Sequence, residues 1–428
     1  MADGPLHTKR LSRLLRLAEV GARTGGALLV QRGADTAARR AAEVLGNLRG
    51  LAAKVGQMAS YVDGFVPEAQ RELYQSTLSQ LQAAAARSSP EAARQLVESE
   101  LAQPLEALFA RWEAEPFASA SIGQVHRAEL HDGSAVAVKV QHPGIDAAVE
   151  SDLMNIGLIE GLVSGLGPKS LNARAIYEVI RARFREELDY RLEAANGEFF
   201  ATLHRGDAQI HVPRVITSHS SRRVLTTELV SGMTLEEAGR EPEALRRTFA
   251  EVLWRFVFTG NLVGGRFNAD PHPGNYVFHA NGSISFLDFG CVQILDPEHV
   301  LQARAAHLAA LDRDEAGFRR HTARLLGTRG GSYERVALEY SRECFEPLFA
   351  SPFRLDRAYV ASLAERIRVL KHQMLAKDGS FVQLPPNMVF LNRLQFGFYS
   401  VLARLDVEAD YAAIERAFLV NGVEPVLP

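Results

Sequence analysis

Length, composition and charge already exclude several classes of protein. The chain has 428 residues, 47% of them hydrophobic and 23% charged, so it can bury a large core over two or three domains. Its 48 Lys and Arg nearly balance 51 Asp and Glu, which leaves no overall field to gather nucleic acid. We therefore expect no nucleic-acid partner. Two cysteines are too few for a disulfide framework or a zinc cluster, so we expect a cytoplasmic protein.

The N-terminal arm is basic, with Arg10, Arg13 and Arg16 set among leucines at helical spacing. This pattern is atypical of a secretory signal or a membrane span. Residues 1–60 hold ten Lys and Arg against four Asp and Glu, which is compatible with peripheral contact at the inner face of a membrane. The alternative is a helix packed on the main domain with solvated arginines.

The predicted elements change from helices to strands and back along the chain. Residues 9–112 are helical in pattern, and Ser88 to Pro90 open a new helix. GQVHRAEL and AVAVKV predict a hairpin across the turn at His131 to Gly133. Later segments predict one long amphipathic helix over 171–197, a strand over Val224 to Val230, a helix from Glu241 to Val263, a hairpin in YVFHANGSISFLDFG, and helices after Asp296.

This order predicts an α+β fold of the bilobal, protein-kinase-like kind. We divide it into a helical N-terminal extension (1–112), a strand-rich N-lobe (113–230) and a helical C-lobe (231–428) with one short hairpin. Phosphoryl transfer in such a fold needs a cover over the phosphates, a fixed cation, and oxygen ligands for Mg²⁺.

Lys139, in AVAVKV, is the candidate cation, because an inward-facing lysine on this strand needs an anion. The alternative is an edge-strand lysine that faces water. In NADPHPGNY, Asp270 and Asn275 have the D-x-x-x-x-N spacing of a catalytic loop, and Asp288 follows in an Asp-Phe-Gly sequence. We expect Asp270 to accept the proton of the attacking hydroxyl, and Asn275 and Asp288 to bind Mg²⁺. Turn and cap roles are the alternatives for these three residues.

The phosphate cover departs from the kinase pattern, because PFASASIGQVH has alanines and serines where glycines are expected. Such a loop is stiffer, and an ordinary strand entry is the alternative. The candidate nucleotide-binding residues are Ala118, Ser119, Ala120, Ser121, Ile122 and Gly123, together with Glu228 and Val230 at the end of the predicted strand.

These motifs together resemble the UbiB/AarF family of atypical kinases, in an unbroken order over residues 45 to 300. The segments that carry the resemblance are KVGQ, PFASASIGQVH, VAVKVQHPGI, EELDYRLEAAN, NADPHPGNY and LDFG. The resemblance implies that Lys54 and Gln57 of KVGQ lie on a helical extension over the active site, where a protein kinase takes its peptide. An exposed helix turn is the alternative for both residues.

The resemblance also implies that Glu193 is the carboxylate partner of Lys139, and that Glu187 and Asp189 form an E-x-D pair associated with KVGQ. Asp189 and Glu193 are expected to share one helical face. A solvated acidic face is the alternative for these acids. Asn268 stands where the family more often has His, and we expect it to affect the rigidity of the loop.

The sequence therefore predicts an atypical kinase or ATPase that uses ATP and Mg²⁺ and supports isoprenoid-quinone or related lipid metabolism. A lipid or quinone precursor is the expected ligand besides nucleotide. The alternative is a nucleotide-gated, lipid-binding module without useful phosphoryl transfer. A general protein kinase is disfavoured by KVGQ and by the alanine-rich loop.

Overall fold

The computed structural model describes residues 88–120, 122–147, 149–150, 181–182, 185–374 and 397–420, with the backbone alone at 367–374. These residues fall into two units. The first holds the described residues up to Arg191 together with Ile216–Leu229, and the second holds Leu192–Val215 and those from Val230 onwards. The predicted extension lies mostly outside the described residues, so the three-part division of the chain stays a prediction.

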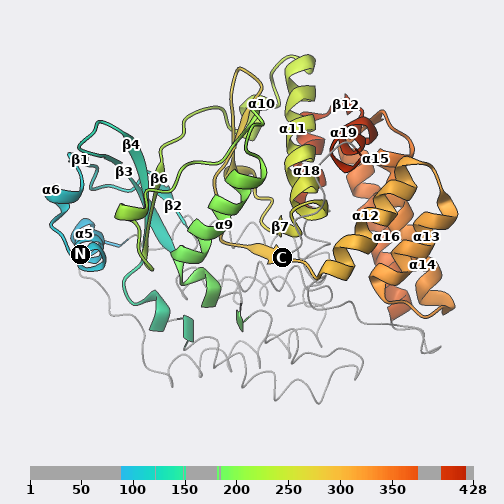
Figure 1. Cartoon of the computed structure of the whole chain (residues 1–428), viewed down its shortest axis with the longest axis horizontal. Coiled ribbons are helices and arrows are strands. Elements are labelled where there is room, and N and C mark those ends of the chain that lie inside the picture. Colours follow the sequence, from blue (N-terminus) through green and yellow to red (C-terminus); the bar gives the residue numbers. More distant parts are fainter. Residues whose placement is uncertain are drawn as a thin grey trace, which may run out of the picture. The chain divides into compact units, whose positions relative to one another are not determined.

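An antiparallel sheet forms the first unit, and its two longest strands are the predicted hairpin (Figure 1). Gly133 supplies the positive φ of 84° in the turn. The sheet order is β1-β3-β4-β6, with β2 paired to β3. The strands are β1 (Arg111–Trp112), β2 (Ala118–Ser119), β3 (Gly123–Glu129), β4 (Ala135–Gln141) and β6 (Val224–Glu228).

Helices α5 (Pro90–Leu101) and α6 (Leu105–Leu108) supply the apolar partner of this sheet. As predicted, a new helix begins at this point: Ser89 caps α5 and Pro90 is its first residue. Alternate valines of β4 are at most 1% exposed and join the leucines of both helices in one cluster. Because side chains alternate along a strand, Lys139 lies on the opposite face of β4.

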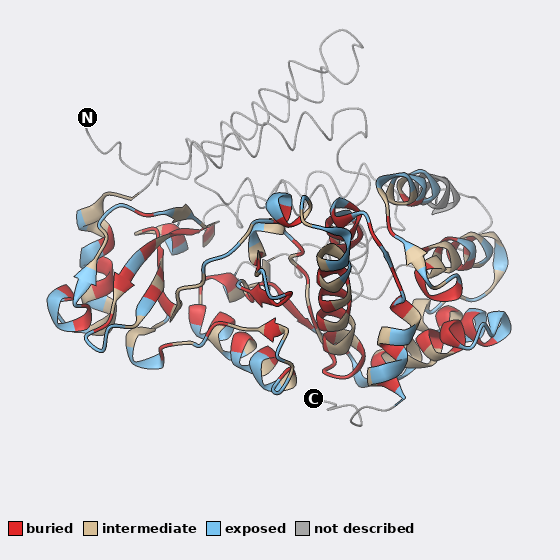
Figure 2. Ribbon diagram, turned by 90° about the horizontal axis from the view of Figure 1, so that it is seen from above, coloured by how far each residue is buried: buried red, intermediate tan, exposed pale blue. Residues whose placement is uncertain are grey.

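The second unit is organised around α11 (Glu243–Leu262), which closely matches the predicted helix. Figure 2 colours the buried residues of the described part red, and nine residues of α11 belong to them. Trp254 on this helix is 1% exposed, and its Nε1 donates to Glu415 Oε1 at 3.0 Å. His307 Nδ1 lies 2.7 Å from the other carboxylate oxygen of the fully buried Glu415. The three residues come from different helices, so this polar contact fixes how those helices pack.

The other helices of this unit are α9 (Tyr190–Leu203), which starts in the first unit, α10 (Leu235–Ala238), α12 (Pro297–Leu311), α13 (Glu315–Leu326), α14 (Gly331–Cys344), α15 (Glu346–Phe349), α16 (Arg357–Met374), α18 (Tyr399–Leu405) and α19 (Tyr411–Leu419). Its strands are β5 (Ile210–His211), β7 (Arg266–Asn268), β8 (Tyr276–Phe278), β9 (Ile284–Phe286), β10 (Val292–Ile294), β11 (Phe353–Arg354) and β12 (Glu408–Ala409). They form three small sheets within the described residues. The predicted β8–β9 hairpin is confirmed, but the prediction of a single hairpin missed the other short strands.

Within the described ranges, no helix combines the length and the apolarity that a bilayer crossing requires. The basic arm for which we predicted peripheral membrane contact lies outside these ranges.

Candidate active site

The predicted catalytic loop is anchored by a strand at each end. NADPHPGNY begins at the last residue of β7 and ends at the first residue of β8. Between them, Pro273–Asn275 forms a turn of 3-10 helix. Asn275 Nδ2 donates to the Asp270 carbonyl oxygen at 3.0 Å. The two residues that the spacing singled out are therefore in direct contact.

A distant segment also supports this loop. Pro271 is buried, and a Cβ built on Gly397, just before α18, would lie 2.3 Å from Pro271 Cγ. Only glycine allows this close approach. The sequence gives no local signal for the contact, because Gly397 lies far along the chain in a segment with a helical pattern.

The β8–β9 hairpin brings Asp288 to the catalytic loop. Just beyond the paired residues of the hairpin, Leu287 N donates to the Asn275 carbonyl oxygen at 3.0 Å. Asp288 follows at once, and its Oδ1 accepts a hydrogen bond from Gly290 N at 2.9 Å. The predicted catalytic loop and metal-binding aspartate thus meet within the second unit.

Helix α9 holds the residue after Asp288. Phe289 is 3% exposed and stacks on Phe200 of α9, with ring centroids 5.2 Å apart. Asn196 Nδ2, also on α9, donates to the Phe289 carbonyl oxygen at 3.1 Å. Asn196 ends the segment EELDYRLEAAN, but no role was predicted for it; its place in that motif was the available signal.

Asn268 connects the loop with the Asp288 segment. Its Nδ2 donates to the Asp288 carbonyl oxygen at 2.5 Å, and its Oδ1 accepts from Asp270 N at 3.1 Å. These contacts agree with the expectation that this position supports the loop.

Glu193 lies beside the segment Asp288 to Gly290. It is 7% exposed, and a Cβ built on Gly290 would lie 3.4 Å from Glu193 Oε2 and 3.3 Å from Asp288 Oδ1. Two carboxylates therefore border Gly290. The predicted ion pair of Glu193 with Lys139 joins residues of different units, so it stays a prediction.

The structure corrects the long helix predicted over 171–197. In its described part, helical residues end at Glu187 and α9 begins anew at Tyr190. Tyr190 N donates to the Arg222 carbonyl oxygen at 2.9 Å, and Gln141 Nε2 donates to the Leu188 carbonyl oxygen at 3.1 Å. These long-range hydrogen bonds take the backbone out of the helix, so Asp189 and Glu193 do not share one helical face as predicted.

The two acids of the E-x-D pair have different surroundings. Asp189 accepts from Arg191 Nη2 at 2.6 Å and from the Arg191 backbone N at 3.1 Å. The hydrogen bonds from Arg191 lower the pKa of Asp189, which keeps it ionised. Glu187, in contrast, is only 8% exposed, so it does not lie on a solvated face.

Lys139 and the alanine-rich segment lie in the first unit. Lys139 Nζ is 5.1 Å from the centroid of the Tyr190 ring, a cation–π distance. Ala118 and Ser119 form β2 and pair with β3, and Ala120 N donates to the Gly123 carbonyl oxygen at 2.9 Å. Ala118 and Ser119 therefore extend the sheet, and the stiffness predicted for this segment stays a prediction.

Packing requires glycine at the first residue of β3, Gly123. A Cβ added to it would lie 2.3 Å from the Val140 carbonyl oxygen and 2.9 Å from the Tyr190 hydroxyl. Of the other predicted residues, Ser121, Lys54 and Gln57 lie outside the described ones. Ile122 is buried, Glu228 ends β6 opposite Val136, and Val230 begins the second segment of the second unit.

The residues predicted to hold Mg²⁺ have suitable donor atoms. Asn275 Nδ2 is engaged with Asp270, so Asn275 Oδ1 is the amide atom left for a metal ion, and Asp288 adds a carboxylate. Within the described ranges, no three His, Cys, Asp or Glu side chains gather into a metal-binding cluster. Phosphate oxygens and water would therefore have to complete the coordination.

Tyr276, close to Asp270, is held in its neutral form. Burial, reinforced by the negative charge of Asp270, raises the pKa of Tyr276 far above its ordinary value. The Tyr276 hydroxyl therefore keeps its proton at neutral pH.

Comparison with known proteins agrees with these motifs. Residues 80–322 match the family model of the ABC1 atypical kinase-like domain. An uncharacterized aarF domain-containing protein kinase, chloroplastic, of Arabidopsis thaliana is 34% identical over 69% of this chain and 43% of its own length. A probable protein kinase UbiB of Xylella fastidiosa is 30% identical over 76% of this chain and 60% of its own. The resemblance to the UbiB/AarF family is thereby confirmed.

A solved structure has a similar fold. The complex of Rv3197 with erythromycin from Mycobacterium tuberculosis has a TM-score of 0.63 and 25% identity, and the match covers 94% of this chain and 96% of that one. The two curated relatives are matched over only 43% and 60% of their length. The shared kinase-like domain therefore carries the likeness to those relatives.

Proposed function

Because the chain belongs to the ABC1 atypical kinase-like family, we propose that it binds MgATP and transfers or hydrolyses the terminal phosphate. One observation carries the proposal: the β8–β9 hairpin holds Asn275 next to the segment of Asp288, while Asn275 itself contacts Asp270. A proton acceptor and two oxygen ligands for a metal ion are thus supplied by one connected stretch of backbone.

Each residue has one task in this proposal. Asp270 orients the attacking hydroxyl or water and accepts its proton. Lys139 places a positive charge on the phosphates, and the turn containing Gly123 covers them with backbone. Asn275 and Asp288 hold Mg²⁺, which neutralises the charge that develops on the transferred phosphate.

For the acceptor, we propose an isoprenoid-quinone precursor or a related lipid. The proposal is supported by the resemblance to the UbiB/AarF family and by relatives named UbiB. KVGQ and the alanine-rich segment disfavour a peptide acceptor. We further propose that the protein is cytoplasmic and that its basic N-terminal arm contacts the inner face of a membrane.

Steady-state ATP hydrolysis by the purified chain, with and without lipid or a small phenolic compound, tests this function. Asp288→Asn should lower kcat by at least about 10²-fold, because a neutral amide replaces the charged metal ligand. Asp296→Asn is the matched control, since Asp296 caps α12 and asparagine caps equally well.

Two results would contradict the proposal. Hydrolysis by Asp288→Asn at the parental rate would remove Asp288 from the mechanism. Tight nucleotide binding in a thermal-shift assay, without product above the buffer background, would favour the nucleotide-gated binding module instead.

A further inference from the structure

Both the nitrogen and the oxygen of the Asn268 side-chain amide form hydrogen bonds. Its Nδ2 donates to the Asp288 carbonyl oxygen at 2.5 Å, and its Oδ1 accepts from Asp270 N at 3.1 Å. A flipped amide would set its nitrogen against an N–H group and its oxygen against a carbonyl, so these partners fix its orientation. One side chain therefore contacts the backbone of both aspartates that the proposed chemistry needs.

The backbone hydrogen bonds between β7 and β10 end before they reach Asp270 and Asp288. Asn268 pairs with Val292 at the end of the β7–β10 ladder, and Ala269 N donates to the Cys291 carbonyl oxygen at 2.7 Å. The ladder thus reaches Ala269, and the Asn268 amide continues the link to Asp270 and Asp288.

We propose that Asn268 is a positioning residue that fixes Asp270 and Asp288 relative to each other. The inference rests on the proposed ATP-handling function. Mg²⁺ demands near-ideal octahedral geometry, and a displacement of about 1 Å can lower a rate about 10²-fold. Loss of the amide should therefore lower kcat and raise the Mg²⁺ concentration needed, with little change in the KM for ATP.

Two substitutions separate the two hydrogen bonds. Asn268→Asp keeps an oxygen to accept from Asp270 N but sets a carboxylate oxygen against the Asp288 carbonyl. Asn268→Ala removes both contacts. Asn281→Asp is the matched control, because Asn281 Oδ1 only accepts, from Ser283 N at 3.0 Å and Ser283 Oγ at 2.7 Å.

The experiment combines ATP turnover of the full chain across a Mg²⁺ titration with hydrogen exchange of its backbone amides. We expect Asn268→Asp to lower kcat about 10²-fold and to raise the Mg²⁺ half-saturation concentration, while Asn281→Asp behaves as the parent. The amide of Asp270 should exchange faster in Asn268→Ala and near the parental rate in Asn268→Asp.

Parental kcat and Mg²⁺ dependence in Asn268→Asp would overturn the proposal, as would unchanged exchange at Asp270 in Asn268→Ala. A parent chain without Mg²⁺-dependent turnover would instead overturn the proposed function. In that case the exchange rates alone decide whether Asn268 positions the two segments.

Discussion

His204, just after the last residue of α9, is a buried histidine in an apolar contact. It is 8% exposed, and its ring stacks on Phe256 with centroids 5.0 Å apart. Burial lowers the pKa of His204 to about 4, the neighbouring Asp207 raises it in part, and Arg255 lowers it further. The folded protein therefore holds this ring neutral, whereas an unfolded chain protonates it near pH 6.5.

The pKa difference predicts a pH-dependent stability. Between pH 6.5 and 4 the unfolded chain binds a proton that the folded chain does not, so the stability contributed by neutral His204 falls with falling pH, by at most about 3 kcal/mol. His204→Phe keeps the stacking and should flatten the pH dependence over this window. Urea unfolding of both proteins from pH 7 down to pH 4.5 measures the effect; parallel curves would contradict it.

Single residues also show what the sequence could and could not predict about the site. The types and spacing of Asp270, Asn275 and Asp288 predicted one phosphoryl-handling site, because this chemistry tolerates few alternatives. Spacing does not say which backbone groups a side chain contacts. The motif EELDYRLEAAN contains Asn196 but does not identify its partner. The contacts of Asn196 with Phe289 and of Gly397 with Pro271 depend on tertiary packing.

At the scale of elements, local chemistry predicted hairpins better than helix boundaries. The β3–β4 hairpin follows from alternation and a glycine turn, both of which are local. The helical pattern over 171–197 did not predict the break at Leu188 and Asp189, where Gln141 on β4 and Arg222 form hydrogen bonds with the backbone of Leu188 and Tyr190. Strands of two or three residues, such as β7 and β10, are too short for alternation to predict.

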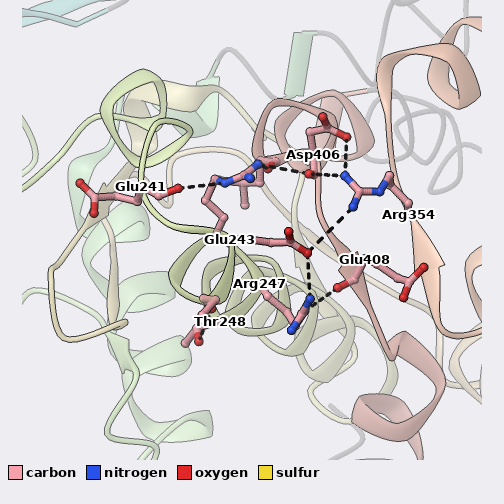
Figure 3. Close-up of polar contacts among 10 residues, drawn as sticks. Glu241, Glu243, Arg247, Thr248, Arg354, Asp406 and Glu408 are labelled. Atoms are coloured by element: carbon pink, nitrogen blue, oxygen red, sulfur yellow. Dashed lines mark hydrogen bonds and ion pairs between the residues drawn. The ribbon is translucent and has the colours of Figure 1, made fainter.

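Arginines of α11 and β11 contact the segment that follows α18. In Figure 3, Arg354 contacts Asp406 and Arg247 contacts Glu408. The half-buried Arg246 donates to the carbonyl oxygens of Glu241 at 3.0 Å, Asp406 at 3.1 Å and Leu405. Arg246 thus supplies donors to carbonyls at the C-terminal end of α18, where the helix leaves them unpaired.

Arg246→Ala should therefore destabilise the second unit by about 1 to 3 kcal/mol, because the partly buried carbonyls of Glu241 and Leu405 lose a charged donor. Arg240→Ala is the control. The side chains of Arg240 and its ion-pair partner Glu236 are 71% and 79% exposed, so loss of the pair should leave the unfolding midpoint nearly unchanged. Denaturant unfolding of both variants gives the comparison. Equal midpoints for the two variants would show that the carbonyl contacts of Arg246 contribute no more than a surface pair.

For the whole molecule, the division into units does not follow chain order. Residues 192–215 belong to the second unit, whereas Ile216–Leu229 return to the first and add β6 to its sheet. A linear reading divides a chain into consecutive segments, and it therefore cannot predict such an exchange. The residues needed for the proposed function are likewise divided, with Lys139 in the first unit and Asp288 in the second.

This division leads to a prediction for nucleotide binding. A ligand that binds only the folded chain stabilises it by about 2.7 kcal/mol at one hundred times its Kd. If MgATP contacts both residues, Lys139→Met and Asp288→Asn should each reduce the rise in the melting temperature that MgATP causes. Each rise is measured against the same variant without nucleotide, which separates lost binding from lost stability.

Arg127→Met is the control for the first unit, because Arg127 is an exposed cation on the neighbouring strand β3 and its guanidinium lies over the Phe117 ring at 4.7 Å. It should retain the full rise. A parental rise in Lys139→Met would mean that the first unit's lysine does not contact the phosphates, and that nucleotide binding depends on the second unit alone.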